Sequence, residues 1–281
     1  MFIPLTELEG EFSHDVSAYG YCRDCGVVHS LPFGQAQHYA GLLLAELEAK
    51  GDMLLPIPES VPEREAIQAQ VDALEGDPKY SMEYLWGKAR GQMLGIMVCQ
   101  REDGTVGIVR AFSGQYDRLY EIPGWVPPVM DLERYNAVNS VGNKVVNEYT
   151  ERINALGADE HLLRQEMKRE RKECSRALME KLFSLYVLQN FKGEQRVLRD
   201  AFHSKEGMRT GTADCCAPKL ISYAQRNNLT PLGIAEFFFG AENKSQTRQH
   251  GTFYDACKEK CQPILGFMLC GCNSPSAPDN G

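Results

Sequence analysis

The sequence has no long hydrophobic run, no basic segment at its start and no excess of positive charge. No apolar stretch approaches the roughly 18 residues that a transmembrane helix needs, so no membrane-spanning segment is expected. Residues 1–10 contain two glutamates and no lysine or arginine, which is unlike a signal peptide and makes the cytoplasm the expected location. A formal net charge of −8 argues against a generally basic, DNA-binding surface but leaves room for a local basic strip.

Cysteine, by contrast, is abundant: the 281 residues include ten cysteines, and six of them lie between Gly211 and Cys272. A reducing compartment keeps thiols free, so metal ligation, catalysis or core packing explains them better than disulfides do. A small buried thiol in the core remains the alternative for each one. The six are Cys215, Cys216, Cys257, Cys261, Cys270 and Cys272.

Hydrophobic spacing predicts an α/β chain of the α+β type. Two apolar runs, 93–100 and 106–112, flank Asp103-Gly104 and predict a β-hairpin. Helical spacing predicts a helix over 34–50 and two long helices that meet near Gly157, and residues 232–239 are expected to form a buried strand. We therefore expect a small mixed sheet packed by helices, with a long antiparallel, coiled-coil-like helical hairpin inserted.

The prolines Pro56, Pro58 and Pro62 mark a connector and divide the chain into two predicted parts. The first, 1–78, holds a Cys-x-x-Cys segment and a helix. The second, 79–281, is the α/β core with the helical hairpin inserted at about 130–190. Along the second long helix lysine and arginine alternate with glutamate, which fits either a solvated face or a basic arm for phosphates.

Two adjacent cysteines, Cys215 and Cys216, are expected at the start of a helix. Asp214 resembles a helix N-cap, and Pro218 fits the first turn, where its missing N–H costs little. The free N–H groups of a helix start favour an anion, so a thiol there ionises easily. Either cysteine could therefore act as a nucleophile or a metal ligand.

The cysteine spacing predicts a zinc site, with two alternative ligand sets. If a helix starts near Asp255, Cys257 and Cys261 are one turn apart and face the same way. They could share one zinc ion with Cys215 and either Cys216 or His250. Alternatively, the Cys-x-x-Cys-Gly turn of Cys22 and Cys25 supplies the other two thiolates of a structural site with Cys257 and Cys261.

The order of hairpin, Cys-bearing helix, strand and paired-Cys helix resembles the zinc-dependent nucleobase deaminases. The resemblance implies a zinc- or thiolate-dependent enzyme acting through Cys215. The Asp-Cys-Cys helix start near His250 separately suggests a Cys215 thiolate with His250 as its base. Ala217 stands where that family places its proton-shuttling glutamate, and Glu236 on the following strand is the nearest substitute. Whether the chain is an enzyme stays open.

Three longer motifs carry a closer resemblance. They are Gly-Thr-Ala-Asp-Cys-Cys-Ala-Pro-Lys-Leu at 211–220, Pro-Leu-Gly-Ile-Ala-Glu-Phe at 231–237 and His-Gly-Thr-Phe-Tyr-Asp-Ala-Cys-Lys-Glu-Lys-Cys-Gln-Pro-Ile-Leu-Gly at 250–266. Over about 91–271 the chain resembles the accessory region that precedes the catalytic domain in long bacterial RluA-type pseudouridine synthases. The His-Arg-Leu-Asp run of the synthases is absent. The resemblance implies a stand-alone accessory protein of RNA modification, with RNA or an RNA-modifying enzyme as partner and no pseudouridylation of its own.

Overall fold

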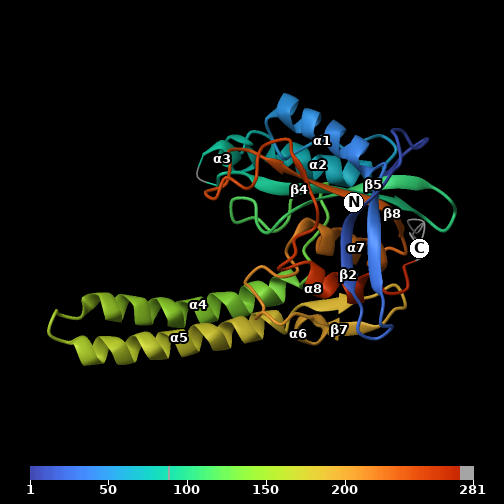
Figure 1. Ribbon diagram of the computed structural model, residues 1–281. Helices are drawn as coiled ribbons and strands as arrows, with labels where there is room; N and C mark the ends of the chain where they lie inside the picture. The colour runs from blue at the N-terminus through green and yellow to red at the C-terminus, as the bar shows by residue number, and fades with distance from the viewer. Residues whose placement is uncertain (88, 273–281) are drawn as a thin grey trace.

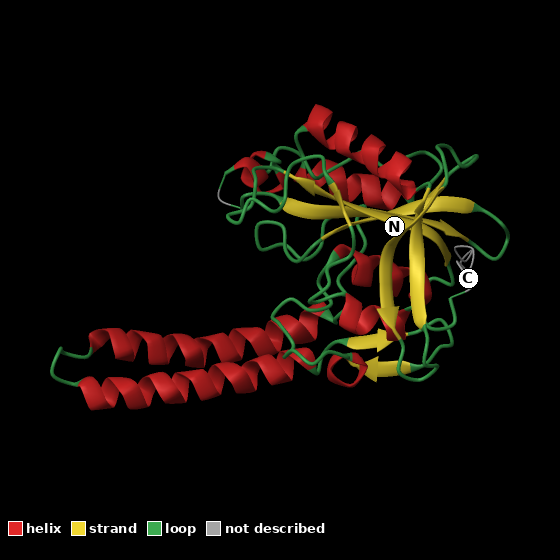
Figure 2. Ribbon diagram, viewed as in Figure 1, coloured by secondary structure: helices red, strands yellow, loops and turns green. Residues whose placement is uncertain are grey.

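A five-stranded antiparallel sheet forms the centre of the molecule. The computed structural model describes residues 1–87 and 89–272. The strand order is β1 (Ile3–Pro4), β5 (Val106–Phe112), β4 (Gln92–Gln100), β8 (Thr230–Phe239) and β9 (Phe253–Tyr254). The predicted fold class, helices on a small sheet with an inserted helical hairpin, is confirmed (Figure 2), and the pairs between described strands are antiparallel rather than mixed.

The predicted β-hairpin is the middle of this sheet. Strands β4 and β5 pair from Leu94 opposite Phe112 to Gln100 opposite Val106. The turn is closed by the N–H of Arg101, which donates to the Thr105 carbonyl at 2.9 Å. Gly104 adopts a φ of 87°, a conformation that costs glycine nothing, so the Asp-Gly pair sets the hairpin locally.

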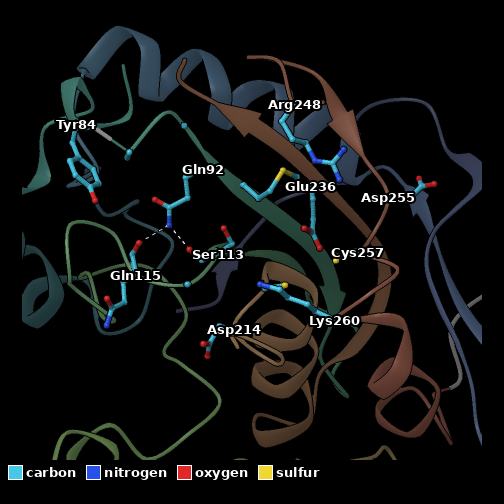
Figure 3. A pocket seen from close by; sticks show the side chains of 16 residues that line it. Tyr84, Gln92, Ser113, Gln115, Asp214, Glu236, Arg248, Asp255, Cys257 and Lys260 are labelled. Atoms are coloured by element: carbon cyan, nitrogen blue, oxygen red, sulfur yellow. Dashed lines mark hydrogen bonds between the residues drawn. The ribbon is translucent and has the colours of Figure 1, made fainter. Parts of the chain in front are cut away.

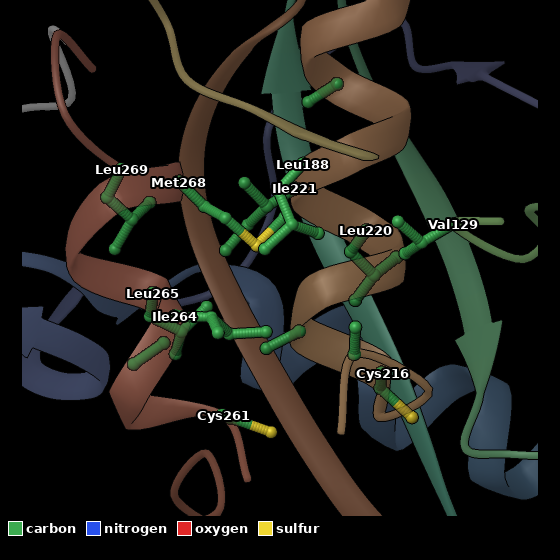
Figure 4. Close-up of a cluster of buried hydrophobic side chains, with 14 of the residues drawn as sticks. Val129, Leu188, Cys216, Leu220, Ile221, Cys261, Ile264, Leu265, Met268 and Leu269 are labelled. Carbon is green, nitrogen blue, oxygen red and sulfur yellow. The ribbon is translucent and has the colours of Figure 1, made fainter. Parts of the chain in front are cut away.

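Helices cover both faces of the sheet (Figure 1). One face packs on α1 (Ala36–Lys50), α2 (Arg64–Leu74) and α3 (Glu83–Trp86), with the short 3-10 helix η1 (Pro78–Tyr80) between the last two. The other packs on α7 (Cys216–Arg226) and α8 (Gln262–Met268) (Figure 4). Strand alternation divides β8 between these layers, because Ala235, Phe237 and Phe239 belong to the α1 layer and Ile234 to the α7 layer.

The two long helices, α4 (Leu132–Ala155) and α5 (His161–Phe183), form an antiparallel hairpin that extends away from the sheet (Figure 1). The Asp131 carboxylate caps α4 by accepting from the Arg134 N–H at 3.0 Å. At the tip, the Arg164 guanidinium donates to the carbonyls of Leu156 and Gly157 at 2.8 and 2.9 Å. Within the described residues, no helix is both long enough and apolar enough to span a membrane.

Two small ribbons complete the fold. Strands β2 (Ser13–Tyr21) and β3 (Val28–Gly34) pair with each other, as do β6 (Val187–Gln189) and β7 (Gln195–Val197), and α6 (Leu198–Ala201) follows β7. The division at residue 78 stays a prediction, although Leu47 and Phe237, from either side of it, share one core. The end of the second predicted part, 273–281, lies outside the described residues.

Candidate metal centre and thiol-lined cavity

Three cysteines and one histidine converge at the end of the β2–β3 ribbon. The ligand atoms of Cys22, Cys25, His29 and Cys270 all lie within 4.8 Å of one another. The Cys25 Sγ is 3.0 Å from the His29 Nε2 and 3.7 Å from the Cys270 Sγ. Four such ligands at this spacing suit one tetrahedral metal ion, and among the described residues they form a centre that could hold it.

Local turn geometry positions the first half of this centre. The N–H of Cys22 donates to the Val27 carbonyl at 2.9 Å, and the N–H of Gly26 donates back to the Cys22 carbonyl at 3.0 Å. Gly26 has a φ of 71°, which glycine adopts without strain. The turn brings both thiols to one side, and His29 on β3 adds the third ligand from the opposite strand.

A close crossing of two backbones positions the fourth ligand. Gly20 on β2 and Gly266 on α8 face each other so closely that a Cβ built on Gly266 would lie 2.1 Å from the backbone of Tyr21. Only glycine permits this approach. The crossing fixes β2 against α8. Cys22 follows β2 directly, and Cys270 comes two residues after the end of α8.

Neighbouring charges favour the metal-binding forms of two ligands. Burial and the nearby Lys192 ammonium lower the pKa of His29, so its imidazole is neutral. Desolvation opposes ionisation of Cys25, but hydrogen bonds from Cys22, from the Val27 N–H and from Cys270 lower its pKa. Burial, and then the Cys22 and Cys25 thiols, raise the pKa of Cys270 to about 11. Clustered thiols cannot all ionise without a cation among them, and a bound metal ion supplies one.

A bidentate ion pair fastens the Cys22 turn to the rest of the molecule. The Arg196 guanidinium on β7 donates to both carboxylate oxygens of Asp24, at 2.9 and 3.1 Å. The same guanidinium lies 4.8 Å from the centre of the Phe267 ring on α8. Arg196 therefore holds the turn beside the helix that leads to Cys270.

A cavity of about 490 Å³ opens on the α7 side of the sheet (Figure 3). Cys215, Glu236 and Cys257 line it, together with the cationic side chains of Arg248 and Lys260. Strand β8 carries Glu236 into this layer because the residue alternates with Ala235 and Phe237. The Glu236 side chain is 4% exposed, and its Oε1 accepts from the Ala217 N–H at 3.0 Å.

Of the predicted zinc ligands, Cys215 and Cys257 line this cavity and Cys261 is buried. Among the described residues, the group whose ligand atoms all lie within 4.8 Å of one another is Cys22, Cys25, His29 and Cys270 rather than this set. Hydrogen bonding with the Cys215 and Cys257 thiols, and then burial, raise the pKa of Cys261 well above its usual value. Hydrogen bonds from Cys261 and from the N–H groups of Lys260 and Glu259 lower the pKa of Cys257 to about 5 against the effect of burial. Burial raises the pKa of Glu236 to about 7. The cavity therefore brings a readily ionised thiol and a buried carboxyl to one surface.

Two sequence predictions about the helix starts need correction. The N-cap of α7 is Cys215, not Asp214, whose Oδ1 accepts instead from the Tyr186 hydroxyl at 2.8 Å. Cys257 and Cys261 do not lie within one helix. They are joined by a turn in which the Cys261 N–H donates to the Cys257 carbonyl at 3.0 Å, and α8 begins at Gln262.

Cys216 points away from the cavity, unlike its neighbour Cys215. Its thiol donates to the Met93 carbonyl at 3.3 Å, and burial raises its pKa well above the usual value. Successive helical residues differ by about 100° around the axis, so one of two adjacent thiols faces the core. Cys216 is a core residue (Figure 4), which is the packing alternative that the sequence left open.

His250 also lies apart from Cys215. Its Nδ1 accepts from the Gly240 N–H at 3.0 Å, and its Nε2 lies 2.9 Å from a Glu48 carboxylate oxygen. The imidazole packs 4.7 Å from the ring of Phe239, whose side chain belongs to the α1 layer. The structure thus separates the predicted base from the α7 layer where Cys215 lies.

The predicted site that joins Cys22 and Cys25 to Cys257 and Cys261 is not formed. Cys22 and Cys25 meet His29 and Cys270 instead. The sequence contained a signal for His29, since it follows Cys25 by four residues. No local pattern marked Cys270, which is 245 residues from Cys25. No protein-family model, curated protein or solved structure matches this chain.

Proposed function

We propose that this protein is a zinc-containing accessory protein of RNA modification without pseudouridine synthase activity of its own. Three thiolates and one imidazole are a common ligand set for structural zinc. This favours zinc at the centre formed by Cys22, Cys25, His29 and Cys270, called here the Cys22 centre. Four protein ligands leave no position for a substrate, so the ion would stabilise the fold. The resemblance of residues 211–220, 231–237 and 250–266 to the accessory region of RluA-type synthases supports the context of RNA modification.

The observation that carries an RNA-binding role is the distribution of charge around α5. Lys168, Lys172 and Arg176 are exposed and follow each other at intervals of four, so they form one stripe. Glu166 and Glu173, also exposed, are rotated from this stripe by about a quarter to a half turn. Arg169 lies between the two sets and pairs with Glu166 at 3.7 Å, so the basic stripe borders an acidic stripe on the helix.

This stripe suits a single-stranded RNA backbone. The hairpin projects from the body (Figure 1), so a strand of RNA can lie along α5 without meeting the sheet. Phosphate contacts from exposed lysine and arginine supply affinity without sequence preference. The whole chain carries a formal net charge of −8, so attraction of phosphates is confined to this local strip.

The test is a filter-binding titration with single-stranded RNA at several salt concentrations. Changing Lys168, Lys172 and Arg176 to glutamate should weaken binding and reduce the slope of log K against log salt by about two, as expected when three phosphate contacts are lost. The matched control changes three exposed lysines outside the hairpin to glutamate: Lys79, Lys205 and Lys244. Equal losses in both variants, or no salt-sensitive binding by the unaltered chain, would refute the RNA-binding role.

A further inference from the structure

We propose that a cavity between α1 and residues 3–9 binds a small ω-amino carboxylate, whose carboxylate pairs with the buried Arg110 guanidinium and whose ammonium meets glutamates at the rim. This cavity, called here the Arg110 cavity, lies on the α1 face of the sheet, whereas Cys216 and Cys261 belong to the α7 face. Neither the Cys22 centre nor the basic stripe of α5 takes part in it.

The Arg110 cavity has a volume of about 310 Å³. Strands β4 and β5 form its floor, and α1 and residues 3–9 form its sides. A volume at the low end of the range for ligand cavities suits a molecule of about ten non-hydrogen atoms. Most of its side chains are apolar, which suits a ligand with an apolar body. They include Ile3, Leu5, Leu42, Leu43, Ile96 and Ile108.

Arg110 is the charged residue at the inner end of this cavity. It is 3% exposed and lies on the α1 face because it alternates along β5 with Val109 and Ala111 of the α7 layer. Its Nε donates to the Gly124 carbonyl at 3.1 Å, and its Cζ lies 5.2 Å from the centre of the Trp125 ring. Neither of these partners carries a charge, so the guanidinium is held in place without being neutralised.

One nitrogen of this guanidinium has no partner. Among residues 1–87 and 89–272, nothing accepts a hydrogen bond from Nη2, which is itself buried. Gly124 keeps the space beside this nitrogen open, because a Cβ there would lie 2.6 Å from Nη2. A buried cation without an anion beside it is strongly unfavourable, and a carboxylate matches the fork of a guanidinium with its two oxygens.

Arg110 keeps its charge in this setting. Burial lowers its pKa to about 10, and the Glu46 carboxylate opposes this effect. The guanidinium is therefore protonated at neutral pH, and a carboxylate that enters the cavity meets a full positive charge. In an environment that excludes water such an ion pair is stronger than one at the surface.

The rim of the cavity has the opposite charge. Glu7, Glu9 and Glu46 line the cavity and are exposed. Glu9 lies 3.6 Å from the His38 imidazole, which leaves Glu7 and Glu46 as acceptors for an ammonium group. The same carboxylates repel phosphates and dicarboxylates. The cavity thus matches a ligand with a negative inner end and a positive outer end.

The separation of these charges selects among amino acids. Arg110 is buried, the rim glutamates are exposed, and apolar side chains such as Leu43 line the cavity with them. In an α-amino acid the ammonium is next to the carboxylate, so it would be placed beside the guanidinium and repelled. An ω-amino carboxylate holds the two groups at opposite ends of an apolar chain.

Calorimetric titration of the full chain with ε-aminocaproate, hexanoate and hexylamine tests the ligand class. We expect ε-aminocaproate to saturate the protein below about 10 mM, hexanoate to bind more weakly and hexylamine not to bind. No saturation by ε-aminocaproate, or hexylamine binding equally tightly, would overturn the proposal. Hexanoate binding at least as tightly would refute the role of the rim and with it the ligand class.

Replacement of Arg110 by methionine separates a binding role from a structural one. We expect the affinity for ε-aminocaproate to fall at least about 30-fold, as when one partner of a buried charge pair is removed. The urea midpoint should rise, because an uncompensated buried charge is replaced by an apolar chain of similar length. A fall in the midpoint with unchanged affinity would show that Arg110 serves only the fold.

Arg164→Met is the matched control, since the Arg164 guanidinium donates to the carbonyls of Leu156 and Gly157 at the hairpin tip. It should lower the midpoint and keep the affinity. If Arg110→Met does not fold, the exposed double variant Glu7→Gln, Glu46→Gln decides. It should weaken ε-aminocaproate binding by about two- to fivefold and leave hexanoate binding no weaker. Unchanged affinity for ε-aminocaproate in this variant would overturn the proposal.

Discussion

Substitution of Gly266 by alanine should separate β2 from α8 and weaken the Cys22 centre. The added Cβ would lie 2.1 Å from the carbonyl carbon and oxygen of Tyr21 and 2.7 Å from the Cys22 nitrogen. Ordinary contact requires about 3.5 Å, so the two backbones must move apart by more than about 1 Å. Because every close atom is backbone, no side-chain rotation can relieve the overlap.

The cost follows from the packing at this crossing. Overpacking a well-packed core costs about 1–3 kcal/mol, and the upper end applies here because a helix must shift against a strand. A loss of about 3 kcal/mol corresponds to a fall in Tm of roughly 6–12 °C for a domain of this size class. The same movement displaces Cys270 from Cys22, so the zinc affinity should fall by about 10- to 100-fold, as it does when supports of a ligand are removed.

Urea unfolding and a competitive zinc titration measure these two effects. Gly41→Ala is the matched control, since Gly41 lies within α1 and a Cβ there would meet nothing within 4 Å. Alanine in a helix interior should raise the free energy of unfolding by about 0.5–1 kcal/mol. This effect is opposite in sign to the one expected for Gly266→Ala. If Gly266→Ala unfolded at the same urea concentration as the unaltered protein and bound zinc equally well, the crossing would not position the centre.

Three further predictions concern the metal, its release by acid and a buried hydroxyl. Chelation of zinc should lower the stability by about 4 kcal/mol relative to protein in zinc at 1,000 times its Kd, measured as the shift in urea midpoint. Acidification should release the ion as His29 and the thiols take up protons, and a metal content that stays constant while the folded protein is acidified to pH 4 would contradict this ligand set. Tyr186→Phe should cost about 1–2 kcal/mol because it leaves the Asp214 carboxylate without its 2.8 Å donor, whereas Tyr19→Phe, at an exposed ring, should cost nothing measurable.

The elements that the sequence predicted well are those whose determinants are local. The hairpin depends on Asp103-Gly104, which sets the turn whatever surrounds it. The predicted helix over 34–50 is α1 from Ala36 to Lys50, because apolar residues repeat at helical spacing along its length. The β2–β3 ribbon was missed, since it bends through two register shifts that break simple alternation.

The metal centre shows where local reasoning ends. The Cys22–Cys25 turn was recognisable because its geometry depends on six neighbouring residues. Its fourth ligand depends on the crossing of Gly20 and Gly266, which are far apart in sequence, and nothing near Cys270 indicates that contact. His250 shows the same limit of local reasoning. Its place in a loop was predictable from the sequence, but its packing against Phe239, on the α1 side of the sheet, was not.

Helix α8 connects the Cys22 centre with the cavity that Cys215 and Cys257 line. It has seven residues, so about 10 Å separates its ends. Its N-cap, Cys261, is joined by a turn to Cys257 in the cavity wall, and Cys270 of the Cys22 centre follows its other end. Loss of zinc from the Cys22 centre would free this end of α8 and loosen Cys261 as well. Cys215 is the N-cap of α7, which leads to no ligand of the Cys22 centre, so loss of the Cys215 thiol should leave the metal affinity of that centre unchanged.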